Sequence, residues 1–297
     1  MDTDRFLDSS ELPELRRPVM LAAFAGWNDA GQAATFALSA LRTMWSAKRF
    51  AGIDPEEFFD FTESRPMISL TPQGQRSLEW PLNEFYAHQI PDAPNDVVLL
   101  IGTEPQLKWR SFCTVVRRVA EQLDASCLLT LGALLADVPH TVDPRVTGFS
   151  TVPSGSPDFK SLGITTSSYE GPTGILGVLH DSWRQLDRPG VSLWGNVPHY
   201  ISASPNPHVA LSLLRRALAI TKLEVPLETL ETRATAFQAQ IDEALAENPD
   251  AMEYVQQLEQ QFASEHPSAT APELIEELEK YLRSRRPPEE PKPPRDG

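Results

Sequence analysis

Pro18-Val-Met-Leu-Ala-Ala-Phe-Ala25, followed by Gly26 and by an Ala-rich segment from Asp29 to Trp45, is the stretch that decides the fold. A short apolar run that ends at a glycine predicts a buried strand and a tight turn. The Ala-rich segment predicts a helix, with Asn28 or Asp29 as its capping residue. This order of strand, turn and helix is the unit from which α/β proteins are built.

The same order recurs further along the chain. A second apolar run, Asp96 to Gly102, precedes a segment from about Trp109 to Leu123 that has apolar residues at helical spacing. Further strands are expected at Ser126 to Leu131 and around Val191 to Trp194, with a helix from about Thr173 to Gln185 between them. The alternation predicts an α/β fold with a mostly parallel sheet and helices on both faces.

Changes in composition divide the chain into four segments. We expect an N-terminal arm at residues 1–17, an α/β domain at 18–222, a helical C-terminal subdomain at 223–284 and a disordered Pro-rich tail at 285–297. Two stretches of the α/β domain do not follow the alternation of strands and helices. Phe58 to Trp80 is predicted to be a short β meander, and Thr141 to Ser168 is rich in loops.

The helical subdomain contains an apolar stripe at helical spacing, made of Tyr254, Val255, Leu258 and Phe262. A stripe of this kind predicts packing on the core or on a second subunit.

Charge and composition exclude several classes of partner. The formal net charge is −15, from 41 acidic and 26 basic residues, so the chain repels phosphate backbones and anionic lipid headgroups. We therefore expect neither nucleic acid nor a membrane as a partner. The N-terminus lacks the basic region of a signal peptide, and no window approaches the roughly 20 apolar residues of a membrane span. Together with only two cysteines, Cys113 and Cys127, these features predict a cytoplasmic protein.

Polar and aromatic residues follow several of the predicted strands. The carboxyl ends of parallel strands gather along one edge of the sheet, where open α/β folds bind ligands. The candidate ligand-binding residues at this edge, and at the start of the helix near Thr173, are Trp27, Asn28, Asp29, Glu104, His140, Glu170, Gly171, Thr173, Gly174, His199 and Tyr200.

Each of these features also has a structural interpretation. Val-Pro-His occurs at 138–140 and again at 197–199, so each histidine either serves a ligand site or satisfies local backbone groups. Glu170-Gly-Pro-Thr-Gly174 either binds an anion at a helix start or forms a helix cap with the Thr173 hydroxyl. Asp29 either caps its helix or places a carboxylate in the cleft. Two histidines without a third ligand do not make a metal site, and the chain contains no GxSxG, HExxH or CxxC motif. We therefore expect no metal, no cofactor and no catalytic residue of a recognisable class.

Seven segments, in order along the chain, resemble the PAC2 family, which includes proteasome assembly chaperones. They are Phe24-Ala-Gly-Trp-Asn-Asp-Ala30, Asp54-Pro-Glu-Glu-Phe-Phe-Asp-Phe61, Arg65-Pro66, Leu131-Gly-Ala-Leu-Leu135, Val138-Pro-His140, Tyr169-Glu-Gly-Pro-Thr-Gly174 and Val197-Pro-His-Tyr200. The resemblance is strong from about Pro18 to Leu218 and continues more loosely through the helical segment.

The resemblance implies a phosphorylase- or hydrolase-like α/β architecture in a homo-oligomer such as a trimer. Eukaryotic and archaeal relatives help to assemble the 20S proteasome, and they dock a C-terminal hydrophobic-Tyr-X tail on its α-ring. This chain ends Arg295-Asp296-Gly297, so that mode of docking is not implied. The family also supplies no catalytic residues to carry over.

Three functions remain open at this stage. The first is a non-enzymatic chaperone-like or scaffold protein with a protein partner related to the proteasome. The second is a small-molecule enzyme or sensor of the hydrolase or nucleoside-phosphorylase type that uses the strand-end cleft. The third is a purely structural role for the motifs, with Trp27, Trp194 and Tyr200 between subunits.

Overall fold

The computed structural model describes residues 4–9, 11–91, 93–152 and 157–265. Residues 266–284 of the expected helical subdomain and the disordered tail expected at 285–297 lie outside these residues. Within the described ranges, none of the helices has the length and apolar character needed to cross a membrane.

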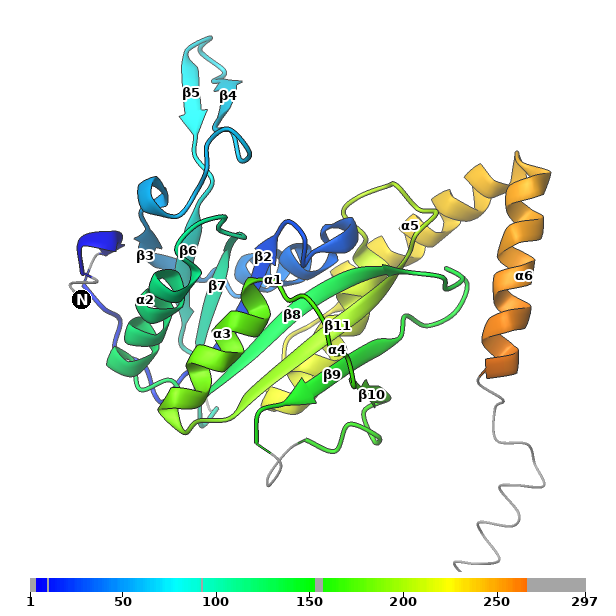
Figure 1. The fold of residues 1–297 in the computed structure, drawn as a ribbon. Helices are drawn as coiled ribbons and strands as arrows, with labels where there is room; N and C mark the ends of the chain where they lie inside the picture. Colours follow the sequence, from blue (N-terminus) through cyan, green and yellow to red (C-terminus); the bar gives the residue numbers. More distant parts are fainter. Residues whose placement is uncertain (1–3, 10, 92, 153–156, 266–297) are drawn as a thin grey trace, which may run out of the picture.

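In the described part of the chain, one mixed sheet has the strand order β1-β3-β6-β7-β2-β8-β11-β9-β10 (Figure 1). Its strands are β1 (Leu7–Ser9), β2 (Val19–Ala25), β3 (Lys48–Ile53), β6 (Asn83–His88), β7 (Val97–Thr103), β8 (Cys127–Ala136), β9 (Val146–Ser150), β10 (Ile164–Thr166) and β11 (Gly190–Pro198). The central strands β7, β2, β8 and β11 are parallel, whereas β6 and β9 flank them in the antiparallel direction. The predicted α/β fold is confirmed.

Helices cover both faces of this sheet. They are α1 (Ala33–Met44), α2 (Trp109–Gln122), α3 (Ile175–Trp183), α4 (Pro207–Thr221), α5 (Glu228–Ala246) and α6 (Pro249–Glu265), with short 3₁₀ turns at Asp4–Phe6, Ala30–Gln32, Pro55–Glu57 and Arg184–Leu186. Helices α1 and α4 pack on one face, with α5 against α4, and α2 and α3 pack on the other.

The composition of β2 follows from this two-sided cover. Alternate residues of the strand belong to different cores, so Leu21 lies under α1 and α4 whereas Met20 and Phe24 lie under α2 and α3. All three side chains are almost completely buried. A strand buried on both faces has no polar side to alternate with, which explains its continuous apolar sequence.

Two strands are longer than the sequence pattern indicates. Strands β8 and β11 continue to Ala136 and Pro198, and they pair in parallel register up to these residues. Gly132 lets the Trp194 ring lie across β8, because a Cβ at Gly132 would come within 2.7 Å of the ring. Gly132 in β8 and Gly195-Asn196 in β11 interrupt the apolar pattern, although Val197 beyond them is buried and Leu135 is exposed.

The region predicted to be a β meander contains a two-stranded hairpin. Its strands are β4 (Met67–Leu70) and β5 (Arg76–Glu79), which form a sheet separate from the main one. Figure 1 shows this hairpin projecting away from the body of the molecule.

The segment before β2 is tied to the main sheet at two points. Strand β1 pairs with β3, and the Arg16 guanidinium forms an ion pair of 2.7 Å with the fully buried carboxylate of Asp96. Burial alone would raise the pKa of Asp96, but hydrogen bonds from Arg16 and from the backbone N–H of Ile90 hold that pKa below its usual range. The carboxylate therefore stays ionised and anchors this segment.

Candidate functional site

Three of the predicted site residues meet where β2, β7 and α3 come together. The Asn28 side-chain Nδ2 donates to Glu104 Oε1 at 2.7 Å, and the backbone N–H of Ile175 donates to the same oxygen at 2.7 Å. Gly174, the N-cap residue of α3, lies against both side chains, since a Cβ there would come within 2.2 Å of Asn28 Oδ1. Only a glycine permits this close approach.

The start of α3 therefore already holds a carboxylate. Unpaired N–H groups and the helix dipole make a helix N-terminus attractive to anions, and here Glu104 supplies the negative charge from within the chain. The prediction that Thr173 caps this helix is wrong, because the helix begins at Ile175 and its N-cap residue is Gly174. The Thr173 hydroxyl instead donates to the carbonyl oxygen of Gly174 at 3.4 Å.

Asp29 caps its helix, which was one of its two interpretations. Its carboxylate accepts hydrogen bonds from the backbone N–H of Ala34 at 2.7 Å and from the hydroxyl of Thr35. Burial raises the pKa of Asp29, although these hydrogen bonds oppose the shift. The carboxylate thus accepts hydrogen bonds from the first turn of α1 and does not point into an open cleft.

A second group forms around His140, on the segment that follows β8. With its proton on Nε2, the imidazole donates to Asp242 Oδ1 at 2.9 Å, and Nδ1 accepts from the Tyr200 hydroxyl at 2.7 Å. The same hydroxyl accepts from the backbone N–H of His140 at 2.8 Å. His140 is buried. Burial raises the pKa of Tyr200 to about 12, so its hydroxyl is a poor nucleophile at neutral pH.

His199, the other histidine of the repeated motif, lies at the edge of this group. Its Nδ1 lies 3.0 Å from Asp137 Oδ1, and its Nε2 lies 3.3 Å from the Tyr254 hydroxyl of α6. The rings of Tyr200 and Tyr254 meet edge to face. Together these contacts hold the C-terminal helices α5 and α6 on the ends of β8 and β11.

Sequence reasoning missed the partners on α5 and α6. Asp242 and Tyr254 lie 102 and 55 positions from the histidines that they contact, and Gln238 Nε2 also donates to the carbonyl oxygen of His140, at 3.1 Å. Nothing in the local spacing of these residues signals the contact. The apolar stripe of α6 predicted that this helix packs on another surface, and Val255 and Leu258 of that stripe are buried.

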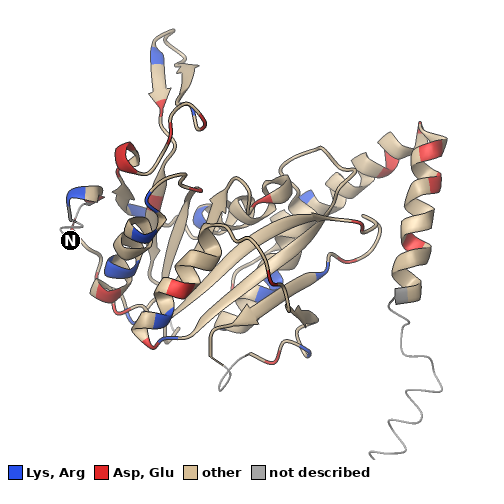
Figure 2. Cartoon of the chain, viewed as in Figure 1, with Lys and Arg blue, Asp and Glu red and all other residues tan. Residues whose placement is uncertain are grey.

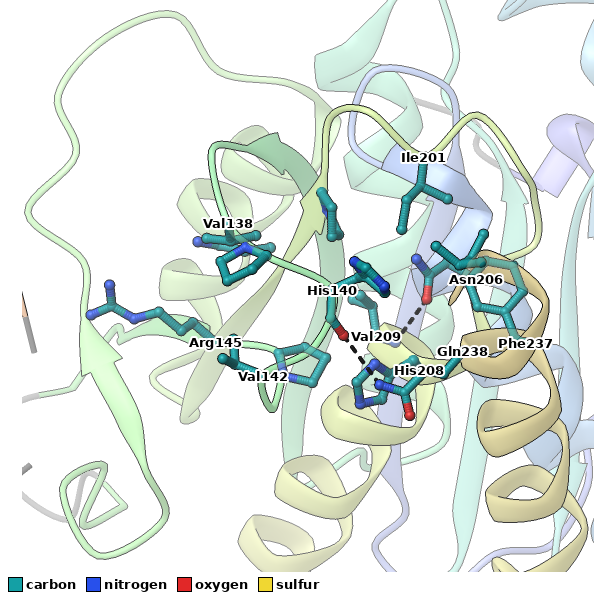
Figure 3. A pocket seen from close by; sticks show the side chains of 15 residues that line it. Val138, His140, Val142, Arg145, Ile201, Asn206, His208, Val209, Phe237 and Gln238 are labelled. Carbon is teal, nitrogen blue, oxygen red and sulfur yellow. Dashed lines mark hydrogen bonds between the residues drawn. The ribbon is translucent and has the colours of Figure 1, made fainter. Parts of the chain in front are cut away.

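The cavity beside His140 is small (Figure 3). Its volume is about 10 Å³, and its lining includes Val138, Ile201, Asn206, His208, Phe237 and Gln238. Such a volume holds about one water molecule, whereas ligand pockets measure roughly 300–1,000 Å³. A larger hollow of about 420 Å³ lies elsewhere, near Glu14, Lys48 and His88, and its lining contains none of the candidate residues.

The candidate residues do not form one cleft. No side-chain hydrogen bond between described residues joins the Glu104 group to the His140 group. Glu170, Gly171 and Thr173 lie exposed in the loop before α3. Over the residues that the structure covers, no cluster of three or more His, Cys, Asp or Glu side chains is arranged to hold a metal ion.

Large apolar side chains are exposed at this same edge. We use the name apolar strand edge for Trp27, Leu107, Leu134 and Leu135, which follow β2 and β7 or end β8. Trp27 is 66% exposed and Leu135 is 59% exposed. Trp27 lies beside the end of β8, because the backbone N–H of Ala133 donates to the carbonyl oxygen of Asn28 at 2.8 Å.

The protein is therefore an α/β protein in which the polar residues at the strand ends have two roles. Asp29 and Glu104 cap α1 and α3, and His140 and His199 hold α5 and α6 in place. Residues 23–245 match the model of the PAC2 family, and the chain belongs to this family. A search of curated proteins found no match.

Several solved structures are similar to this chain. A PAC2 family protein of Streptomyces avermitilis is 39% identical, with a TM-score of 0.72, over 80% of this chain and 99% of that one. A proteasome-assembly chaperone homologue of Mycobacterium tuberculosis has the same identity, TM-score and coverage. An archaeal proteasome activator of Pyrococcus furiosus is 19% identical, with a TM-score of 0.65, over 80% of this chain and 97% of that one, and it shares the fold.

Proposed function

We propose that this protein is a non-enzymatic, chaperone-like binding protein that contacts a protein partner through the apolar strand edge. The observation that carries the proposal is the exposure of Trp27, Leu107, Leu134 and Leu135 at the edge where α/β proteins bind their ligands. Exposed large apolar side chains along one edge are typical of protein interfaces, and exposed aromatic residues supply much of the energy of such interfaces.

The polar residues of the edge support a binding role over a catalytic one. Glu104 is engaged at the start of α3, and Asp29 is engaged at the start of α1. His140 has both ring nitrogens engaged, one of them by the hydroxyl of Tyr200. A general base needs a free nitrogen or oxygen within reach of a substrate, and the cavity beside His140 has room for about one water molecule. At the strand ends, Asp29, Glu104 and His140 therefore leave the small-molecule alternative without a free general base.

The partner that we propose is a proteasome subunit or an assembly intermediate of the proteasome. The support comes from the Mycobacterium tuberculosis relative, which is a proteasome-assembly chaperone homologue and is 39% identical to this chain. The acidic balance of the chain, −15, fits a protein partner with basic surface. We also propose that the protein works as a homo-oligomer in the cytoplasm.

The test mixes the purified full-length chain with separately purified α and β subunits of the 20S proteasome of its own source. Native gels and chemical cross-linking should show a complex with a free subunit, and Trp27→Ser with Leu135→Ser should weaken it at least tenfold. Met252→Ser is the matched control, because Met252 is an exposed apolar side chain on α6, outside the apolar strand edge. Absence of any complex, or equal binding by the double variant, would overturn the proposal.

A further inference from the structure

The hairpin formed by β4 and β5 has the alternation of a half-buried sheet. In an antiparallel pair, residues directly opposite one another lie on the same face. Ile68 pairs with Leu78 and Leu70 pairs with Arg76, so one face carries three large aliphatic side chains and an arginine. The other face carries Ser69 opposite Ser77 and Met67 opposite Glu79. The Ser69 hydroxyl donates to the Glu79 carboxylate at 2.9 Å on this polar face.

The apolar face of the hairpin is exposed. Ile68 is 59% exposed, Leu70 is 71% exposed and Leu78 is 49% exposed. At the base of the hairpin, Trp80 packs edge to face on Phe61, with ring centroids 4.8 Å apart. The strands beyond this base extend away from the body (Figure 1). An isolated two-stranded sheet is only marginally stable in water, so an apolar face of this kind requires cover.

The charge of the hairpin points to what covers it. Residues 65–82 contain Arg65, Arg76 and Glu79, for a net charge of +1, so the remainder of the chain carries −16. Arg65 and Arg76 are both exposed, and Arg76 lies on the apolar face. Figure 2 shows the basic position on β5, and on the body it shows both acidic and basic positions. An apolar face that carries an arginine fits a partner of net negative charge, and the rest of this chain carries −16.

We infer that the hairpin is an arm that packs its apolar face on the acidic body of a second copy of this chain. The contact joins two different surfaces, the arm of one copy and the body of the next. Contacts of this kind close into a ring, exchange reciprocally in a dimer, or continue as an open filament where the rotation does not close. The inference rests on the homo-oligomer of the proposed function, but it concerns a surface distinct from the apolar strand edge, so the hairpin variants test it separately from binding of a proteasome subunit.

The experiment measures the self-association of the full-length chain by sedimentation velocity over a range of protein concentrations. The wild-type chain should form a discrete oligomer. The triple variant with Ile68→Thr, Leu70→Thr and Leu78→Thr should weaken association at least tenfold, because three apolar contacts are lost. Threonine keeps the strand preference of these positions. Arg76→Glu should also weaken association, and added salt should weaken the association of the wild-type chain.

Met67→Thr is the matched control, because it removes an equally exposed apolar side chain from the opposite face of the same hairpin. It should associate as the wild-type chain does. All variants should unfold at the wild-type temperature when measured as monomers, since the hairpin lies outside the two main cores. The inference would be overturned by a wild-type chain that stays monomeric or by a triple variant that associates as strongly as the wild type. It would also be overturned if Met67→Thr weakened association as much as the triple variant does. Cross-links from the hairpin to the body of another copy identify the receiving surface, and cross-links only within one copy overturn the inference.

Discussion

Glu104 and Ile175 lie 71 positions apart in the sequence and are joined by a 2.7 Å hydrogen bond from the backbone N–H of Ile175 to the carboxylate. The bond closes the start of α3 with a side chain from the end of β7. The loop before α3, which contains Glu170-Gly-Pro-Thr-Gly174, therefore has a packing role in this protein, since its last glycine admits Glu104 and Asn28.

This arrangement predicts that Glu104→Ala destabilises the fold by about 1–3 kcal/mol, because the variant leaves Asn28 Nδ2 and the N–H of Ile175 without their acceptor. Urea unfolding of the purified protein measures the change. Glu170→Ala, in the exposed loop nearby, should change stability by less than about 0.5 kcal/mol. Similar values for the two variants would contradict the capping role of Glu104.

His140 should matter more than its partner Asp242. The Asp242 side chain is 63% exposed, so its bond to His140 is screened by solvent and Asp242→Ala should cost less than about 1 kcal/mol. His140→Ala removes a buried ring that contacts both Tyr200 and Asp242, and it should cost about 2 kcal/mol or more. In both variants hydrogen exchange should rise in α5, because this contact holds α5 on the strand ends. Unchanged exchange in α5 after loss of His140 would show that other contacts carry the docking.

The α/β fold could be predicted because its evidence is local. The apolar run of β2 and the helical spacing of α1 and α2 each lie within one short window, and the alternation of such windows specifies a parallel sheet. The ends of β8 and β11 could not be predicted in this way. Gly132 interrupts the apolar pattern of β8 and Gly195-Asn196 that of β11, so the local pattern does not show that the two strands continue to pair up to Ala136 and Pro198.

The candidate residues could be placed at the strand edge, but their roles could not be assigned. Glu104 and Asn28 were expected there, and the structure brings them together. The role of each carboxylate depends on which N–H group it meets, and for Glu104 that group belongs to Ile175, 71 positions away. The same limit applies to His140, whose partner Asp242 belongs to a helix 102 positions away.

Gly132 should be irreplaceable in the presence of Trp194. A Cβ at Gly132 would come within 2.7 Å of the Trp194 ring, which is too close for either strand to accommodate without moving. Gly132→Ala should therefore destabilise by about 1–3 kcal/mol. In a Trp194→Leu background the added methyl group has room, and the same substitution should cost distinctly less. A double-mutant cycle by urea unfolding measures the difference, and strictly additive effects would contradict the direct clash.

His180 should make the fold sensitive to acid. His180 belongs to α3, and its imidazole is buried between this helix and the sheet. Its Nε2 lies 2.9 Å from the Thr130 hydroxyl, and that hydroxyl donates to the hydroxyl of Ser192, also at 2.9 Å. Nε2 is therefore the donor, and buried Nδ1 has no hydrogen-bond partner among the described residues. Burial lowers the pKa of His180 to about 3, from an ordinary value of 6.5.

The pKa of His180 is lower in the folded chain than in the unfolded chain. Between pH 6.5 and about 3, His180 is therefore protonated in the unfolded chain but neutral in the folded chain. The free energy of unfolding should be insensitive to this group above pH 6.5 and should fall below it, by at most about 1.4 kcal/mol per pH unit. Urea unfolding of the wild-type chain and of His180→Leu, at several pH values from 7.5 to about 4, isolates this contribution from those of the other histidines. His180→Gln serves the same purpose if the leucine variant folds poorly. The wild-type curve should fall more steeply than the variant curve below pH 6.5, and parallel curves would mean that His180 becomes protonated without cost in the folded protein.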